Sequence, residues 1–194
     1  MHLEAYVEEP SAKEALDQLL PRVLGAEHSF KVHPFRGKQQ LLGEIPSRLR
    51  GYSRWLPPDW RVVVLVDEDR EDCHALKQRL VEHARSVGLG DRVLCRVAVE
   101  ELEAWFLGDV EAIRAVYPKV PATLARRAGL RDPDGVKGGT WEALDRALRR
   151  AGYPQGLVKT AAAREIATHM DPDRNWSHSF CVFRDGIRRL AAGV

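Results

Sequence analysis

VVVLVDEDRED, residues 62–72, joins a run of five apolar residues to a dense group of carboxylates. A continuous apolar run is typical of a central strand in a parallel sheet, because helices cover both faces of such a strand. Carboxylates crowded at the end of that strand repel one another unless water, a base or a cation relieves the repulsion. The stretch therefore predicts an α/β fold and marks the place where its chemistry is concentrated.

Strand and helix patterns alternate through the first hundred residues. We expect strands over residues 2–7, 30–35, 61–66 and 92–99. Amphipathic patterns separate these strands. Ser11 is expected to cap the first helix, and Pro46 is expected to interrupt or kink the second. The alternation predicts a parallel-sheet core with helices packed on both faces.

The remainder of the chain, from Glu100 onward, is mostly helical in pattern. Helical periodicity is expected over residues 101–117, 139–153, 159–170 and 177–191. A chain of 194 residues is long enough to bury a substantial core as a single domain. We therefore expect residues 1–108 to form the α/β core and residues 109–194 to form a helical C-terminal lobe packed on it, as one compact unit.

Composition and charge narrow the class of protein. The chain has 30 Lys and Arg against 28 Asp and Glu, a formal net charge of +2, so a docking surface for a polyanion must come from local segregation of charge. The first residues lack the pattern of a signal peptide, and no apolar run is long enough to cross a bilayer. We expect a cytoplasmic protein without a membrane partner.

Carboxylates follow two of the predicted strands. Glu8 and Glu9 come directly after the first strand, and Asp67, Glu68 and Asp69 come after the third. Ligands of open parallel sheets bind beyond the carboxyl ends of the strands, so these side chains converge if the two strands are neighbours. Residues two apart on an extended segment point the same way, so Asp67 and Asp69 are expected to face one cation together.

Oxygen ligands of this kind favour a site for Mg²⁺ or Mn²⁺. The alternative is a loop whose acids are solvated or cap the next helix through Asp69 or Asp72. The segment ELEAWF, residues 101–106, adds two more acids. On a helix, Glu101 and Glu103 lie on the two flanks of a buried stripe, and either side chain can lean over the strand ends. An ordinary amphipathic helix with solvated acids is the alternative there.

Basic side chains are candidates for phosphate contact. Lys38 lies between a predicted strand and a helix N-terminus, where backbone N–H groups and a lysine can hold a phosphate, and a plain loop is the alternative. Six arginines give the predicted helical lobe a positive character: Arg126, Arg127, Arg131, Arg146, Arg149 and Arg150. Backbone phosphates are their natural partner if they share a face with the acids, and solubility is the alternative explanation.

The order of strand, Glu, strand and Asp-x-Asp resembles the TOPRIM fold of topoisomerases, primases and OLD-type nucleases. More closely, five segments are similar to the DUF4276 family of bacterial proteins, which is regarded as TOPRIM-related: YVEEPSAKEAL, HPFRGKQQLL, VVLVDEDREDCHALK, ELEAWFLGD and NWSHSF. The resemblance runs over nearly the whole chain. TOPRIM proteins usually have Gly after the first glutamate, whereas Glu9 and Pro10 follow Glu8 here.

The resemblance implies a TOPRIM-like sheet and Mg²⁺-dependent cleavage of phosphodiester bonds in nucleic acid, with DNA expected in preference to RNA. In that interpretation Glu8, Asp67 and Asp69 are catalytic residues and metal ligands. Glu101 and Glu103 then complete a second metal position.

The resemblance also draws attention to Lys159, which would neutralise a phosphate oxygen near the metal and is otherwise a solvated lysine in the first turn of a helix. OLD-type relatives carry an ATPase domain in the same chain, whereas this sequence has no Walker motif. A separate ATPase partner in bacterial genome defence is therefore expected.

The alternative function is a non-catalytic adaptor that keeps the fold and binds nucleic acid or the ATPase, and the pair Glu9 and Pro10 favours it. A haloacid-dehalogenase phosphatase fits poorly, because Glu71 stands where DxDx[TV] requires Thr or Val. A glycosyltransferase needs a larger nucleotide-sugar domain than the predicted α/β core offers.

Overall fold

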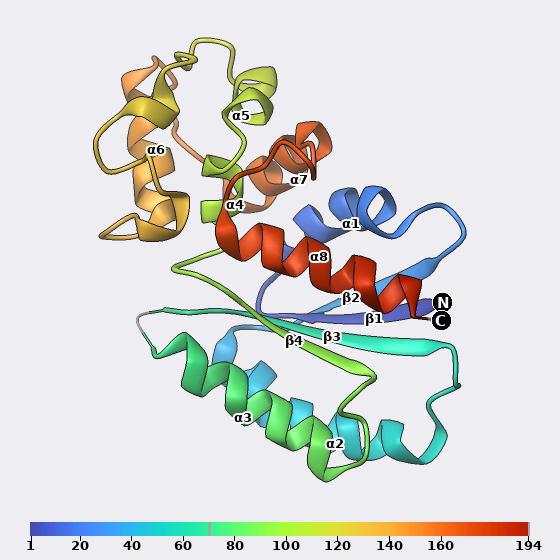
Figure 1. Cartoon of the computed structure of the whole chain (residues 1–194). Helices are drawn as coiled ribbons and strands as arrows, with labels where there is room; N and C mark the ends of the chain where they lie inside the picture. Colours follow the sequence, from blue (N-terminus) through green and yellow to red (C-terminus); the bar gives the residue numbers. More distant parts are fainter. Residues whose placement is uncertain (70, 194) are drawn as a thin grey trace.

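Four parallel strands form one sheet in the computed structural model, which describes residues 1–69 and 71–193 (Figure 1). The strands are β1 (His2–Val7), β2 (Ser29–Pro34), β3 (Trp60–Asp67) and β4 (Val93–Ala98). They lie in the order β2-β1-β3-β4, and all neighbours are parallel. The predicted parallel sheet is confirmed, with each strand beginning and ending within one residue of its predicted bounds.

Helices cover both faces of the sheet. On one side lie α2 (Lys38–Trp55) and α3 (Cys73–Ser86), and on the other lie α1 (Pro10–Leu24) and α8 (His178–Ala192) (Figure 1). The remaining helices are α4 (Glu103–Leu107), α5 (Val110–Val116), α6 (Thr140–Arg150) and α7 (Lys159–His169). Short 3₁₀ turns occur at Leu124–Arg126 and Pro133–Gly135. Within the described residues, none of the helices has the length and apolar character needed to cross a membrane.

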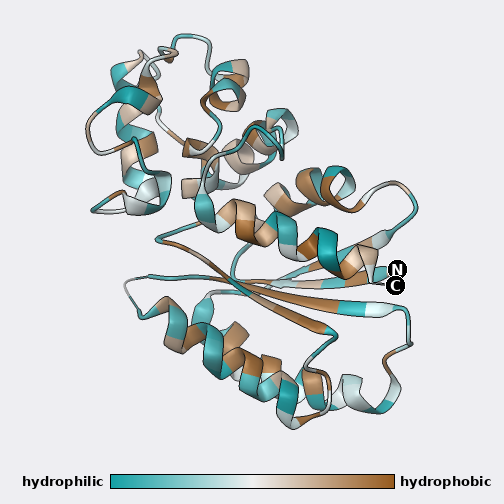
Figure 2. Ribbon diagram, in the orientation of Figure 1, coloured by the Kyte–Doolittle hydropathy of each residue, from teal (hydrophilic) through white to brown (hydrophobic). Residues whose placement is uncertain are grey.

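The core forms on both faces because β3 is continuously apolar over residues 62–66. Val63 and Leu65 pack into the cluster that includes α1 and α8, whereas Val62, Val64 and Val66 pack into the cluster that includes α2 and α3. Figure 2 shows the hydrophobic strands at the centre, with helices that are hydrophilic on their outer surfaces. Burying one such side chain contributes roughly 1.5–3 kcal/mol.

The expected cap at Ser11 and an interruption of the second helix at Pro46 are absent. Ser11 does not cap α1, because Glu9 occupies the N-cap position without a side-chain cap and Pro10 begins the helix, where no N–H partner is required. Pro46 lies inside α2, which continues past it. The apolar face of α2, with Leu41 before the proline and Leu49 after it, is buried against the sheet and offsets the lost backbone hydrogen bond.

The single helix predicted over residues 101–117 is two helices. Gly108 separates α4 from α5, and the carboxylate of Asp109 caps α5 by accepting a hydrogen bond of 3.3 Å from Ala112 N. Asp109 is fully buried and also binds Arg174, which donates from Nε at 2.8 Å. This ion pair connects the turn to the segment that leads into α8.

The last helix returns to the sheet. α8 packs on β4 and α1, and α7 packs on α1. Apolar residues from both of the expected parts of the chain therefore share one cluster. The division at residue 108 falls at the turn between α4 and α5. That the two parts form one compact unit stays a prediction.

Gly108 supplies a stability test of this turn. A Cβ built on Gly108 would lie 2.2 Å from Asn175 Oδ1 and 2.8 Å from Ser177 N, although its φ of −71° suits any residue. Asn175 cannot easily move aside, because its Nδ2 donates to Trp105 O at 2.7 Å. We expect Gly108→Ala to lower the free energy of unfolding by about 1–3 kcal/mol, measured by urea denaturation.

Gly43→Ala is the matched control. Gly43 lies within α2 and a built Cβ there meets no atom within 4 Å, so alanine should raise the free energy of unfolding by about 0.5–1 kcal/mol through its higher helix propensity. Equal effects of the two substitutions would show that the turn is not tightly packed.

Candidate functional site

The acids at the ends of β1 and β3 meet because these strands are neighbours. Val7, the last residue of β1, pairs with Leu65 of β3, so Glu8 lies beside the end of β3. The backbone N–H of Asp67 donates to Glu8 Oε2 at 3.2 Å. Glu8 is half-buried, and its pKa is raised, first by burial and then by the negative charge of Asp69.

Asp67 is buried at the centre of this group. Its carboxylate makes no hydrogen bond with another described residue. The pKa of Asp67 lies well above its usual range, first because of burial and then because the charges of Glu8 and Glu103 lie nearby. Its ionised form is therefore poorly stabilised by the protein alone.

Glu103 is fully buried, which excludes for this residue the alternative of a solvated acid on an amphipathic helix. The long helix does not form, and all five residues of α4 are buried beneath the lobe. Neither carboxylate oxygen of Glu103 makes a hydrogen bond with another described residue. Burial raises the pKa of Glu103 to about 7, and Lys159, with Nζ 3.7 Å from Oε1, opposes that rise. Buried carboxylates whose oxygens accept no hydrogen bond are rare in folded proteins.

Glu4 of β1 is also a buried carboxylate, but its oxygens have hydrogen-bond partners. His2 Nε2 lies 2.9 Å from Glu4 Oε1, and His33 and Tyr52 bind Oε2. Burial raises the pKa of Glu4, but the hydrogen bonds from His2 and His33 outweigh it, and the pKa is lowered. The carboxylates of Asp67 and Glu103, at the carboxyl edge, differ from Glu4 in this respect, because their oxygens accept no hydrogen bond from another described residue.

Both predicted phosphate-binding lysines lie at this edge, and carboxylates surround each of them. Lys159 pairs with Glu9 and Glu103, and its pKa is raised even though burial acts in the opposite direction. Lys38 donates to Glu68 O at 2.8 Å and lies 3.6 Å from Asp69 Oδ2. Their binding of phosphate stays a prediction.

Asp69 does not continue the strand. β3 ends at Asp67, and Asp69 is exposed with a φ of 50°, in the left-handed region. The expectation that an extended segment turns Asp67 and Asp69 toward the same point is therefore wrong. The turn places Asp69 N 3.3 Å from Glu100 O, so the loop after β3 is tied to the loop after β4.

Glu101 anchors another element. Its Oε2 accepts hydrogen bonds from Thr140 Oγ1 and Trp141 N, both at 2.9 Å, at the N-terminus of α6. With Asp69 it lines an acidic hollow of about 340 Å³, whose other walls are Glu100, Gly138, Gly139 and Glu142.

Sequence reasoning missed Glu100 and Glu142 as members of this hollow. The available signal was the pair Gly138 and Gly139, whose φ angles of 83° and 88° allow the backbone to turn close to the acids. Helix capping by Asp72, which accepts from His74 N and Ala75 N, agrees with one alternative for the acidic loop.

The arrangement offers oxygen donors but not a preassembled metal cage. No group of three or more His, Cys, Asp or Glu side chains among the described residues is already positioned to hold a metal ion. The buried carboxylates of Asp67 and Glu103, with Glu8 beside them, fit a hard divalent cation in the chemistry of their donors. A proton on each buried carboxyl is the other way to relieve the repulsion.

The raised pKa of Glu103 gives a pH-dependent prediction for metal-free protein in EDTA. Between pH 4.5, the usual value, and about 7, the folded state keeps a proton that the unfolded state releases, so stability is lost as the pH rises through this window. Glu103→Gln does not titrate. We expect it to match the wild type at pH 4.5 and to be more stable by about 1–3 kcal/mol at pH 7.5 in thermal and urea unfolding.

Glu4→Gln is the control of opposite sign, since the pKa of Glu4 is lowered. Glu4→Gln should destabilise the protein at pH 7.5, because the substitution removes the carboxylate that binds His2 and His33. A Glu103→Gln protein that is less stable than the wild type at pH 7.5 would contradict the pKa assigned to Glu103.

Comparison with known proteins finds the same family that the sequence motifs resemble. A family model described as "Domain of unknown function (DUF4276)" matches residues 7–190. No curated protein and no solved structure matches the chain. The match spans nearly the whole sequence and includes every acid of the site described above. The chain therefore belongs to the DUF4276 family.

Proposed function

We propose that the protein is a Mg²⁺-dependent nuclease of TOPRIM type that cleaves phosphodiester bonds in nucleic acid, DNA in preference to RNA. The observation that carries the proposal is the pair of buried carboxylates, Asp67 and Glu103, that lack hydrogen bonds with other described residues at the carboxyl edge of the sheet. The resemblance of the Glu8, Asp67 and Asp69 pattern to TOPRIM proteins supports the fold-family part of the proposal.

The inner acids are the proposed first cation site. Glu8, Asp67 and Glu103 offer oxygen atoms in a poorly solvated setting, where an opposite charge is worth more than in water. A bound divalent cation would supply charge stabilisation to a phosphate and lower the pKa of a coordinated water. Glu8, whose pKa is raised and which is half-buried, is the proposed group for proton transfer.

The outer acids are the proposed second position. Asp69 forms an ion pair with Lys38, and Glu101 accepts hydrogen bonds from the N-terminus of α6 through Oε2 alone. Glu101 Oε1 and the carboxylate of Asp69 therefore remain as donors on the rim of the acidic hollow. These two residues are proposed to complete the metal set when substrate phosphate is present, because they line the acidic hollow.

The lysines have a conditional role. Lys159 forms ion pairs with Glu9 and Glu103, and Lys38 forms one with Asp69. Neutralising the carboxylates frees the ammonium groups to contact phosphate oxygens, which is the role proposed for them. A separate ATPase partner in bacterial genome defence is proposed from the resemblance alone.

A specific observation favours the second candidate, a non-catalytic adaptor. Lys159 lies among Glu9, Asp67 and Glu103, and the pKa of Glu103 is about 7, so one lysine and bound protons can balance the cluster without metal. An adaptor would keep the fold, bind nucleic acid or the ATPase, and cleave nothing.

Metal binding separates the two candidates. We expect Mn²⁺, followed by electron paramagnetic resonance of the free ion, to bind the wild type saturably and to bind Asp67→Asn at least about tenfold more weakly. Asp91→Asn, at an exposed acid remote from the site in the fold, should bind like the wild type. Asp67→Asn should not be less stable than the wild type in EDTA, because it removes an unpartnered buried charge.

Cleavage is the second measurement. With Mg²⁺, the wild type should cut a labelled single-stranded or duplex DNA, and Asp67→Asn should lose about 100-fold or more of that rate. Saturable metal binding without cleavage in the wild type, also after an ATPase is supplied, would favour the adaptor. Equal Mn²⁺ binding by the wild type and Asp67→Asn would remove the basis of the nuclease proposal.

A further inference from the structure

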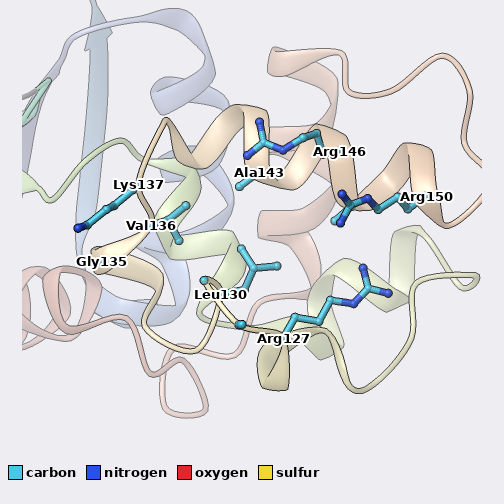
Figure 3. Close-up of a pocket in the computed structure, with 11 residues that line it drawn as sticks. Arg127, Leu130, Gly135, Val136, Lys137, Ala143, Arg146 and Arg150 are labelled. Atoms are coloured by element: carbon cyan, nitrogen blue, oxygen red, sulfur yellow. The ribbon is translucent and has the colours of Figure 1, made fainter.

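A cavity of about 440 Å³ lies in the helical lobe, separate from the acids at the carboxyl edge (Figure 3). One wall is a single face of α6, formed by Ala143, Arg146, Ala147 and Arg150, which recur at the spacing of one helix face. The opposite wall is formed by two loop segments, residues 127–130 and 135–137. We call it the arginine cavity.

The charge of the arginine cavity has one sign. Its cationic residues are Arg127, Lys137, Arg146 and Arg150, and no Asp or Glu is among the residues that line it. None of these four cations forms an ion pair or a side-chain hydrogen bond with another described residue. Elsewhere on α6 the pattern is different, because Arg149 is paired with Asp145 at 2.7 Å. Unpaired cations around a hollow focus a positive potential into it.

The interior of the arginine cavity is apolar. Figure 3 shows Leu130 and Val136 facing Ala143, with the guanidinium groups of Arg127 and Arg150 toward one end and Lys137 at the other. Val136 and Ala143 are buried, so this surface is a formed floor. A ligand that fits must combine a flat or apolar body with an anionic group.

We propose that the arginine cavity binds a nucleotide, with its phosphate at the guanidinium groups of Arg127, Arg146 and Arg150 and its base against Leu130 and Ala143. Guanidinium forks bind phosphate oxygens in pairs, which a lysine cannot do. The volume lies within the range of roughly 300–1,000 Å³ that small-molecule sites span. The nucleotide can be free or can belong to a single strand of nucleic acid.

The position of the arginine cavity favours the strand. The loop that supplies Val136 and Lys137 to the cavity continues into Gly138 and Gly139, which line the acidic hollow. On α6, Glu142 faces the hollow and the adjacent Ala143 faces the cavity. A strand held by the cavity would therefore pass directly toward the acids. This statement about the strand rests on the proposed function, whereas nucleotide binding by the cavity does not.

The test is equilibrium binding in EDTA, where no cleavage can occur. The probe is a fluorescently labelled eight-nucleotide single-stranded DNA followed by anisotropy, with adenosine monophosphate and inorganic phosphate as competitors. Arg127→Glu combined with Arg150→Glu should weaken binding of the strand at least tenfold and reduce its salt dependence. Ala143→Phe, which fills the cavity and keeps every charge, should weaken binding by a similar factor.

Lys77→Glu combined with Arg85→Glu is the matched control. It changes the net charge by the same amount on α3, which lies on the other face of the sheet, and both residues are exposed (Figure 1). It should change affinity less than twofold. Every binding measurement is made in EDTA, whereas the nuclease proposal is tested by metal binding and cleavage, so failure of the nuclease proposal and failure of this one are distinguishable.

The competitors identify the source of the nucleotide. Displacement of the strand by adenosine monophosphate would support a site for free nucleotides, and displacement only by unlabelled strand would support a strand site. If the α3 control weakens binding as much as the arginine variants do, or if Ala143→Phe binds normally, the lobe carries only a diffuse positive surface and the proposal is overturned. Thermal unfolding of each variant verifies that it is folded.

Discussion

The structure depends on the cost of burying ionisable carboxyl groups at the end of a parallel sheet. β3 must be apolar on both faces to form the centre of the fold, and this forces Asp67, its last residue, into a dry position. α4 then covers the same edge and brings the fully buried Glu103 beside it. A protein can tolerate such a pair only with protons, a cation or a basic side chain as compensation. Lys159 supplies part of that compensation, and protons or a cation must supply the rest.

The helical lobe is organised around the same edge. Glu101 and Glu103 are two residues apart, yet one holds the start of α6 and the other is sealed beneath the lobe. Asp109 performs a comparable task a few residues later, where it caps α5 and binds Arg174. Acids along this short segment thus serve as tethers for three separate parts of the lobe. The fold therefore uses carboxylates near this edge of the sheet to hold its elements in place.

Much of the architecture was predictable from the sequence, because a strand covered on both faces has a long apolar run such as that of β3. The carboxyl ends of parallel strands lie at the same edge of the sheet, so the position of the acids was predictable as well. The sequence could not reveal the burial of Glu103, because a helical pattern over residues 101–117 says nothing about a break at Gly108. It also placed Asp69 on an extended segment, whereas a left-handed φ at that residue is set by contacts with the loop after β4. Residues in the acidic hollow come from distant parts of the chain, and only the tertiary fold brings Glu142 to Asp69. Local periodicity carries no information on contacts between residues that are distant in the sequence.

The hydrogen bonds from Thr140 and Trp141 to Glu101 have a thermodynamic consequence. One carboxylate belongs both to the rim of the acidic hollow and to the N-terminus of the helix that walls the arginine cavity. Any ligand that withdraws Glu101 from α6, or holds it there more firmly, alters the free energy of that helix. Because linkage is reciprocal, a cavity ligand that changes the free energy of α6 would change the affinity of the hollow by the same factor. Such coupling would pass through a single side chain, that of Glu101.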